Sequence, residues 1–225
     1  MTETTLIVGA GSGLSASLAR LFTREKMRVA LAARDTDKLA PLLAETGARA
    51  WPCDASLPDS VTALFAAIEA ELGAPDLVVY NASARVRGAI TEIDAPGVLR
   101  ALTVSCYGGF LVAQAAARAM LTRGSGTILF TGASASVKGY PRSASFAMGK
   151  FGLRGLAQSL ARELQPQNIH IGHVVIDGGI GRAGDTNGDR MLDPDAIALA
   201  YLQLHRQQRS AWASEIELRP WVENF

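Results

Sequence analysis

The sequence predicts an α/β protein with a Rossmann-type, doubly wound parallel sheet of about seven strands and helices on both faces. Two observations predict this fold. Short aliphatic runs typical of buried strands alternate along the chain with longer stretches of helical periodicity. The first of these runs, residues 6–8, leads directly into a glycine-rich turn that opens a helix. Because 225 residues without a shift in composition fit one core, we expect a single domain over residues 1–225.

The remaining elements are expected in the same alternation. Apolar residues at helical spacing, such as Val61, Leu64 and Ile68, indicate the helices, and β-branched or aliphatic runs indicate the strands. Helices are predicted over residues 14–26, 36–46, 57–72, 97–120, 146–164 and 196–205, and strands over residues 28–33, 49–52, 76–80, 126–131, 168–176 and, near an edge, 211–218. The 97–120 helix is apolar around most of its circumference, which predicts burial on more than one side.

Composition excludes several classes of function. The net charge of +1, with acidic and basic residues mixed, leaves no basic tract for nucleic acid. The two cysteines, Cys53 and Cys106, lack metal-ligand spacing and suggest a reducing compartment, and no metal site is expected. No segment reads as a signal peptide or approaches about 20 apolar residues. We therefore expect a cytoplasmic protein that binds neither nucleic acid nor membranes.

The glycine turn has the chemistry of a phosphate site. Gly9, Gly11 and Gly13 precede a helix at Leu14, so the backbone can approach a pyrophosphate whose charge the helix N-terminus favours. Their spacing fits G-x-x-x-G-x-G with Ser15 in the last position, and in this it resembles the short-chain dehydrogenase/reductase family. The alternative is a strand–turn–helix that binds no ligand.

The resemblance implies a nicotinamide dinucleotide held by the turn, including Ser12 and Leu14. An acid at the end of the second strand selects NAD, and an arginine nearby accommodates the 2′-phosphate of NADP. Here Ala33 occupies the acid position and Arg34 follows it, which implies NADP(H). Asp35 counts against this interpretation, and the alternative is that Arg34 is a solvated loop cation.

Two further positions carry the family pattern for the cofactor. Asp54, with Ala55 after it, follows the third strand where the family has an acid beside the adenine, but it would serve equally as the N-cap of the next helix. Asn81 and Ala82 follow the fourth strand and resemble the family's N-A-G turn, with Ser83 in place of the glycine.

The resemblance is incomplete at the catalytic positions. The family's Y-x-x-x-K motif reads Phe146 to Lys150, with the two residues on one helix face but no tyrosine. The family's catalytic serine position falls on Ala133, with Ser134 next to it, and its asparagine falls on Ser105. We therefore assign Lys150, Ser134 and Phe146 as the catalytic positions of a divergent branch.

Phenylalanine has no proton to give, so the sequence leaves two functions open. The first is an NADP(H)-dependent oxidoreductase of small carbonyl or alcohol substrates, with Ser134, Tyr140, Lys150 or a bound water as proton donor. The second is a non-catalytic NADP(H)-binding protein, acting as a redox sensor or structural partner. Tyr107 is a poorer donor, because two residues past Ser105 on a helix it turns away from the site.

The C-terminal part supplies the last expectations. The segment from Asp177 to Ile180 stands in place of the family's P-G-x-[IV] loop, whose aliphatic residue contacts the nicotinamide, and residues 181–193 form a short polar lid or flap. His170 and His173 face opposite sides of a strand and are expected to be core histidines, not metal ligands.

Substrate and assembly are only outlined. The sequence offers Arg85, Arg87 and Arg182 as possible substrate anchors. The resemblance implies a homodimer or homotetramer, formed by the 97–120 helix and the helix that carries Lys150.

Overall fold

The computed structural model describes residues 2–222, and its centre is one parallel sheet. The strand order is β3-β2-β1-β4-β5-β6-β7, and every neighbouring pair is parallel. The strands are β1 (Thr4–Val8), β2 (Arg28–Ala33), β3 (Arg49–Pro52), β4 (Leu77–Tyr80), β5 (Gly126–Thr131), β6 (Ile169–Ile176) and β7 (Glu215–Leu218). The predicted doubly wound sheet of seven strands is confirmed.

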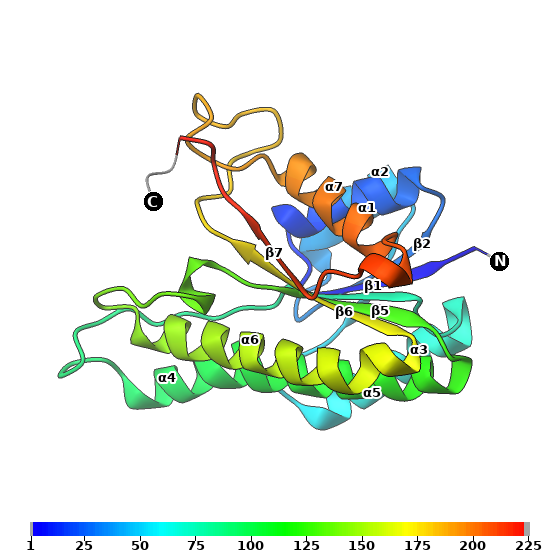
Figure 1. The fold of residues 1–225 in the computed structure, drawn as a ribbon, viewed down its shortest axis with the longest axis horizontal. Coiled ribbons are helices and arrows are strands. Elements are labelled where there is room, and N and C mark those ends of the chain that lie inside the picture. The colour runs from blue at the N-terminus through cyan, green and yellow to red at the C-terminus, as the bar shows by residue number, and fades with distance from the viewer. Residues whose placement is uncertain (1, 223–225) are drawn as a thin grey trace.

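Helices cover both faces of the sheet (Figure 1). On one side lie α1 (Leu14–Arg24), α2 (Ala40–Thr46) and α7 (Pro194–His205), and on the other lie α3 (Pro58–Leu72), α4 (Ala95–Leu102), α5 (Gly108–Arg123) and α6 (Ala144–Leu164). Short 3₁₀ turns occupy Asp37–Leu39, Ser134–Ser136, Gln165–Gln167 and Arg209–Ala211.

Alternation along the strands explains why there are two cores. In β1, Leu6 and Val8 belong to the core beneath α3, α5 and α6, whereas Ile7 belongs to the core beneath α1 and α7. Successive side chains of a strand point to opposite faces, and a parallel sheet covered on both faces needs apolar residues at every position. The continuous aliphatic runs of the sequence are the consequence.

The long helix predicted over residues 97–120 needs a correction. It runs from Ala95 to Arg123, but a π-helical turn, Thr103–Tyr107, separates α4 from α5. Two side-chain hydrogen bonds hold this turn: the Tyr80 hydroxyl, from β4, donates to the carbonyl of Val104, and the turn's own Ser105 hydrogen-bonds to the loop after β4. Gly108 and Gly109 follow the π turn directly, but its hydrogen-bond partners lie 24 and 21 residues away in the sequence, where no local pattern reveals them.

The same helical run also qualifies the expectation that no segment is long and apolar enough to span a membrane. Ala95–Arg123 meets that criterion by length and composition alone. Core helices of water-soluble proteins meet it too, and α5 contributes Leu111, Val112 and Met120 to the core under the sheet. Packing on the sheet therefore accounts for part of this apolar composition, since 33% of the apolar stretch is buried.

The strand order places the site. The chain proceeds outward from β1 to β2 and β3, then returns to β4 on the other side of β1. In open α/β sheets the loops at such a reversal diverge and leave a crevice at the carboxyl ends of the strands. The glycine turn follows β1, and residues 81–94 follow β4, so both border this crevice.

Candidate dinucleotide and substrate site

The glycine turn is fixed by close contact with the loop after β4. Gly9 has φ +87°, and its backbone N–H and that of Ala10 both donate to the Ala32 carbonyl at 2.9 Å. A Cβ added at Gly9 would fall on the backbone of Ala82. Glycine is therefore required at position 9 both for its conformation and for space.

The other two glycines leave room where a ligand is expected. A Cβ at Gly11 or Gly13 would meet no atom within 4 Å. Gly13 is the N-cap of α1, and no side chain caps this helix end among residues 2–222. Uncapped N–H groups beside open space suit a pyrophosphate, so the residues present fit a dinucleotide.

Asn81 and Ser15 hold the turn in place. The Asn81 amide Nδ2 donates to the Ser15 hydroxyl at 2.7 Å, and that hydroxyl donates to the Gly9 carbonyl at 3.1 Å. Ser15, which departs from the glycine of the motif, is thus a bracing residue. The Asn81 side chain thus hydrogen-bonds to Ser15, and Asn81 also borders the groove beside the glycine turn.

Arg34 lies on the groove beyond β2. A groove of about 380 Å³ is bordered by Gly9, Arg34, Asp54, Ala55 and Ala82, among others. Asp35, which argued against a phosphate partner, instead pairs with Lys38 at 2.9 Å. Arg34 has no carboxylate partner among the ion pairs of residues 2–222.

Asp54 does not cap a helix, so that alternative is wrong. Its carboxylate accepts from the backbone N–H of Ser56 at 2.9 Å and from the Ser56 hydroxyl at 2.6 Å, whereas the N-cap of α3 is Leu57. These hydrogen bonds, and to a lesser degree the charge of Arg34, hold the pKa of Asp54 below its usual range. Asp54 is therefore an anion at the edge of the groove.

Lys150 is the buried cation at the far end of the crevice. It projects from α6, its side chain is 3% exposed, and its Nζ donates to the Thr131 carbonyl at the end of β5 at 2.6 Å. Burial lowers its pKa to about 8. It borders a pocket of about 600 Å³ together with Asn81, Ser134, Phe146 and Ile180, so these predicted site residues are brought together.

Phe146 lies between two cations. The ring centroid is 5.8 Å from Lys150 Nζ and 4.5 Å from the guanidinium carbon of Arg85. A guanidinium at this distance from a ring face makes a favourable cation–π contact. The phenyl group therefore positions Arg85 at the point where the two pockets described here meet.

Ser134 belongs to a network that sequence reasoning missed. The Asp177 carboxylate is paired with Lys138 at 3.1 Å, and the Ser134 side chain also favours its charged form. Burial by itself would raise the pKa of Asp177, but these partners outweigh it and the pKa lies below its ordinary value. Asp177 was noticeable in the sequence, because it is an acid where the family loop has proline. Lys138 was not, because it belongs to no motif.

Ser105 braces the substrate side. It is fully buried in the π turn, and its hydroxyl accepts from the Ala84 N–H at 3.0 Å while donating to the Ala84 carbonyl at 3.1 Å. Both backbone groups of one loop residue are satisfied by one side chain. The loop that carries Arg85 is thereby tied to the helix layer.

Other candidates lie away from the pockets. Tyr107 is 45% exposed, which agrees with the prediction that it turns away from the site, and it stacks on Phe110. His170 and His173 are buried, the former hydrogen-bonded to the Ala213 carbonyl and stacked on Trp212, the latter bonded to Glu215 at 3.0 Å. The core-histidine prediction is confirmed.

The predicted lid, residues 181–193, forms a compact loop. Residues 181–193 are closed by isolated bridges between Ile180 and Leu192 and between Arg182 and Asp185. Arg182 is not among the residues that line the pockets described here. Within residues 2–222 no group of three or more His, Cys, Asp or Glu side chains has a metal-binding arrangement.

Comparisons with known proteins agree with this geometry. Residues 3–181 match the model of the short chain dehydrogenase family. An uncharacterized oxidoreductase of Staphylococcus aureus strain N315 is 27% identical over 221 residues, covering 96% of each chain. A short-chain dehydrogenase from Rhodopseudomonas palustris superimposes with a TM-score of 0.87 at 38% identity, covering 97% of this chain and 99% of the other. A metagenomic short-chain oxidoreductase in complex with NADP gives 0.85 at 26% identity, covering 98% of each.

Proposed function

Because the chain belongs to the short-chain dehydrogenase family and is an oxidoreductase of that family, we propose that it uses NADP(H) to interconvert a small carbonyl compound and its alcohol. The observation that carries the cofactor choice is Arg34, a guanidinium on the groove directly after β2 that forms no ion pair within residues 2–222. Asp35 is tied to Lys38 and does not compete for it. A relative of 26% identity is described in complex with NADP, which supports the same choice.

The proposed cofactor residues follow the groove from one end to the other. Arg34 would take the 2′-phosphate, Asp54 and Ala55 the adenosine end, and the uncapped start of α1 the pyrophosphate. Lys150 and Ile180 border the nicotinamide end. The full proposed set is Gly9, Gly11, Ser12, Gly13, Leu14, Arg34, Asp54, Ala55, Asn81, Ala82, Lys150 and Ile180.

The chain must supply a proton at the substrate oxygen. When bound, the cofactor supplies a hydride to the substrate carbon, and the carbonyl π electrons move to the oxygen. Phe146, where the family resemblance expects tyrosine, has no exchangeable proton, whereas Ser134 and Lys150 both line the pocket. We assign the proton to the Lys150 ammonium, directly or through a water, since a pKa of about 8 leaves it protonated at neutral pH yet ready to release.

The second candidate function is a non-catalytic NADP(H)-binding protein. The observation in its favour is again Phe146, which removes the usual acid while the glycine turn and groove remain intact. Measurements of nucleotide binding and turnover separate the two proposals. The non-catalytic function requires nucleotide binding but no turnover.

The first experiment is a calorimetric titration of the purified protein with NADPH and NADH side by side, followed by a screen of carbonyl compounds for NADPH oxidation. The proposed oxidoreductase predicts NADPH-preferring binding and turnover that declines above about pH 8, where Lys150 loses its proton. Binding without turnover of any compound would favour the non-catalytic function. Binding of neither nucleotide would contradict both.

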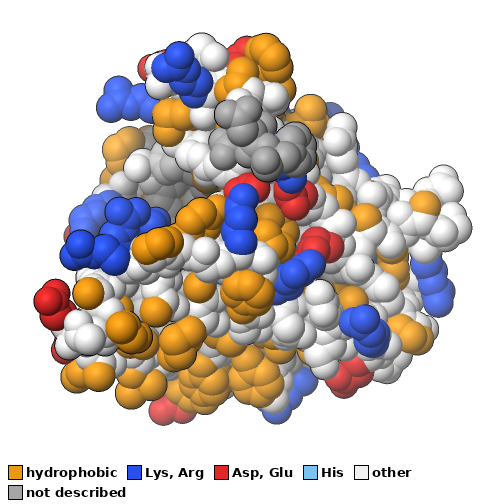
Figure 2. Space-filling model, turned by 60° about the vertical axis from the view of Figure 1, so that its left-hand side comes forward, with side chains coloured by type: hydrophobic (Ala, Val, Ile, Leu, Met, Phe, Trp, Pro, Cys, Tyr) orange, Lys and Arg blue, Asp and Glu red, His pale blue; other side chains and the backbone are white. Residues whose placement is uncertain are grey.

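Assembly is proposed from the exposed apolar side chains of the lower helix layer. Figure 2 shows hydrophobic side chains gathered along the lower part of the molecule, over the layer of α4, α5 and α6. Leu99, Tyr107, Phe110, Met148 and Phe151 are between 39% and 66% exposed. We propose that a second copy covers them in a homodimer or homotetramer, which sedimentation analysis tests, and that the chain acts as one domain in the cytoplasm.

A further inference from the structure

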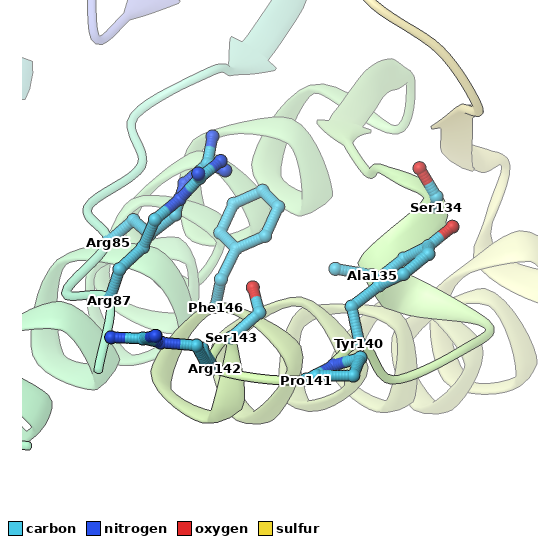
Figure 3. A pocket seen from close by; sticks show the side chains of 9 residues that line it. All are labelled: Arg85, Arg87, Ser134, Ala135, Tyr140, Pro141, Arg142, Ser143 and Phe146. Atoms are coloured by element: carbon cyan, nitrogen blue, oxygen red, sulfur yellow. The ribbon is translucent and has the colours of Figure 1, made fainter. Parts of the chain in front are cut away.

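Three arginine side chains line one pocket beside Phe146. The pocket has a volume of about 600 Å³, and its lining includes Arg85, Arg87 and Arg142 but no acidic residue. Figure 3 shows the three arginines on one side of the pocket, Ser134 and Tyr140 on the other, and Phe146 between them. Two segments far apart in the sequence, residues 85–87 and 134–146, supply these groups.

The three guanidinium groups lack protein counterions. Within residues 2–222 none of them takes part in an ion pair, whereas Arg20, Arg154 and Arg206 each pair with a glutamate. Clustered like charges repel one another, and a concave site of one sign raises the local concentration of the opposite ion. The pocket therefore carries positive charge that an anion from outside the chain would balance.

The arginines are held in place by their backbones. The Ser145 hydroxyl accepts from the Val86 N–H at 3.0 Å and donates to the Val86 carbonyl at 2.7 Å, and the Gly88 N–H donates to the Arg142 carbonyl at 3.3 Å. These bonds join the loop after β4 to the start of α6. Arg142 has φ +60°, a conformation that L residues adopt rarely and that is enriched at binding sites.

The arginine pocket opens onto the proposed reaction site. Arg85, Ser134 and Phe146 line it and also line the pocket that contains Lys150 and Ile180. A ligand with its reactive carbon near Lys150 thus extends directly toward Arg87 and Arg142. The hydroxyl groups of Ser143 and Tyr140 add hydrogen-bond donors along this path.

We propose that this pocket binds the anionic group of the substrate, so that the enzyme acts on carbonyl compounds that carry a carboxylate or a phosphate. Guanidinium groups suit both anions because they donate to two oxygens at once. Arg87 and Arg142 bind the anion, and Arg85, packed on Phe146, lies between it and the carbonyl group. This assignment rests on the proposed oxidoreductase function.

The test uses matched probes of one shape and different charge. 4-Carboxybenzaldehyde and 4-formylphenyl phosphate are anions, and methyl 4-formylbenzoate and 4-methoxybenzaldehyde are their neutral counterparts. Binding is measured by calorimetry with NADP⁺ present and KM by NADPH oxidation. We expect the anions to bind at least about tenfold more tightly than the neutral probes, with an advantage that shrinks as salt is added. The stronger of the two anions identifies the substrate group.

Arg87→Gln and Arg142→Gln should each weaken the anionic probes about tenfold and leave the neutral probes unchanged. The matched control is Arg24→Gln, an exposed arginine on α1 outside these pockets, which removes the same charge. NADPH affinity and the thermal midpoint should stay constant in all three variants, because the side chains are exposed.

The outcomes separate this proposal from the one it rests on. Equal binding of anionic and neutral probes, or equal losses in Arg142→Gln and Arg24→Gln, overturns the anion site even when NADPH is bound and oxidised. Arginine-dependent binding of the anions without any turnover supports the site and removes the oxidoreductase function instead.

Discussion

The two ends of the site are built differently. The nucleotide end is made of backbone: a glycine turn with no room for a Cβ at position 9, and an uncapped helix start. The substrate end is made of side chains, with Lys150 and Phe146 from α6 and three arginines from the loop after β4 and the segment before α6. The nucleotide end is constrained by steric space and the substrate end by charge. Different substitutions should therefore affect the two ends.

Their cations also differ. Lys150 is buried against the Thr131 carbonyl, whereas Arg34, Arg85 and Arg142 are exposed on the borders of grooves. Because Lys150 is buried, its charged form destabilises the folded state, whereas solvent stabilises the exposed guanidinium groups. Removing a cation should therefore affect stability at one position and ligand affinity at the others.

The largest effect is expected from Lys150→Met. Loss of the proposed proton donor should lower carbonyl reduction by at least about 100-fold. The wild-type folded-state pKa of about 8 lies below the unfolded value near 10.5, so between these pH values the unfolded state binds more protons and wild-type stability rises with pH. The difference between these two pKa values of Lys150 corresponds to about 3 kcal/mol of unfolding free energy.

The stability of Lys150→Met relative to wild type should consequently fall by about 3 kcal/mol between pH 7 and pH 10.5. Urea unfolding at several pH values measures this difference, and common contributions from other groups cancel. A constant difference across that range would show that Lys150 is not desolvated as the structure places it.

Gly9→Ala is the next largest and acts at the nucleotide end. The positive φ and the overlap with Ala82 should together cost about 3 kcal/mol of unfolding free energy and abolish NADPH binding. Gly47→Ala is the control, because Gly47 has φ +69° but no atom within 4 Å of the added Cβ. It should cost about 1 kcal/mol. Equal losses would mean that the contact with Ala82 is unimportant.

Ser105→Ala probes the brace of the substrate end. It leaves the N–H and carbonyl of Ala84 without their partner, at a cost of about 2 kcal/mol in unfolding free energy. The exposed Ser159 on α6 provides the control, since Ser159→Ala should change stability by less than about 0.5 kcal/mol. Indistinguishable urea midpoints for the two variants would exclude this role for Ser105.

Ser105 also shows where prediction from the sequence ends. The strands were predictable because burial on both faces produces uninterrupted aliphatic runs. The first and last residues of β2, β3 and β5 agree with their predicted bounds. The glycine turn was predictable because strand, turn and helix are contiguous. The partner of Ser105 is a loop 21 residues away, and no local pattern contains it.

The same limit applies to the substrate pocket. The sequence offered Arg85, Arg87 and Arg182 as substrate anchors but not Arg142, because the approach of Arg142 depends on the hydrogen bonds that join the loop after β4 to α6. The Asp54 alternatives were separated only when the structure placed its carboxylate on Ser56. Contacts between distant segments decide these points.

Arg34→Ala is the smallest change and tests the cofactor choice. Removing a guanidinium that meets only the 2′-phosphate should weaken NADPH about tenfold and NADH by less than about twofold, since NADH offers it no charge partner. Lys38→Ala is informative beside it: Lys38 borders the same groove but is already paired with Asp35, so its loss should weaken NADPH less. Titrations of both variants with both nucleotides measure this. Equal losses of NADPH and NADH in Arg34→Ala would show that Arg34 acts on the shared part of the nucleotide, and the preference for NADP(H) would then have to come from elsewhere in the groove.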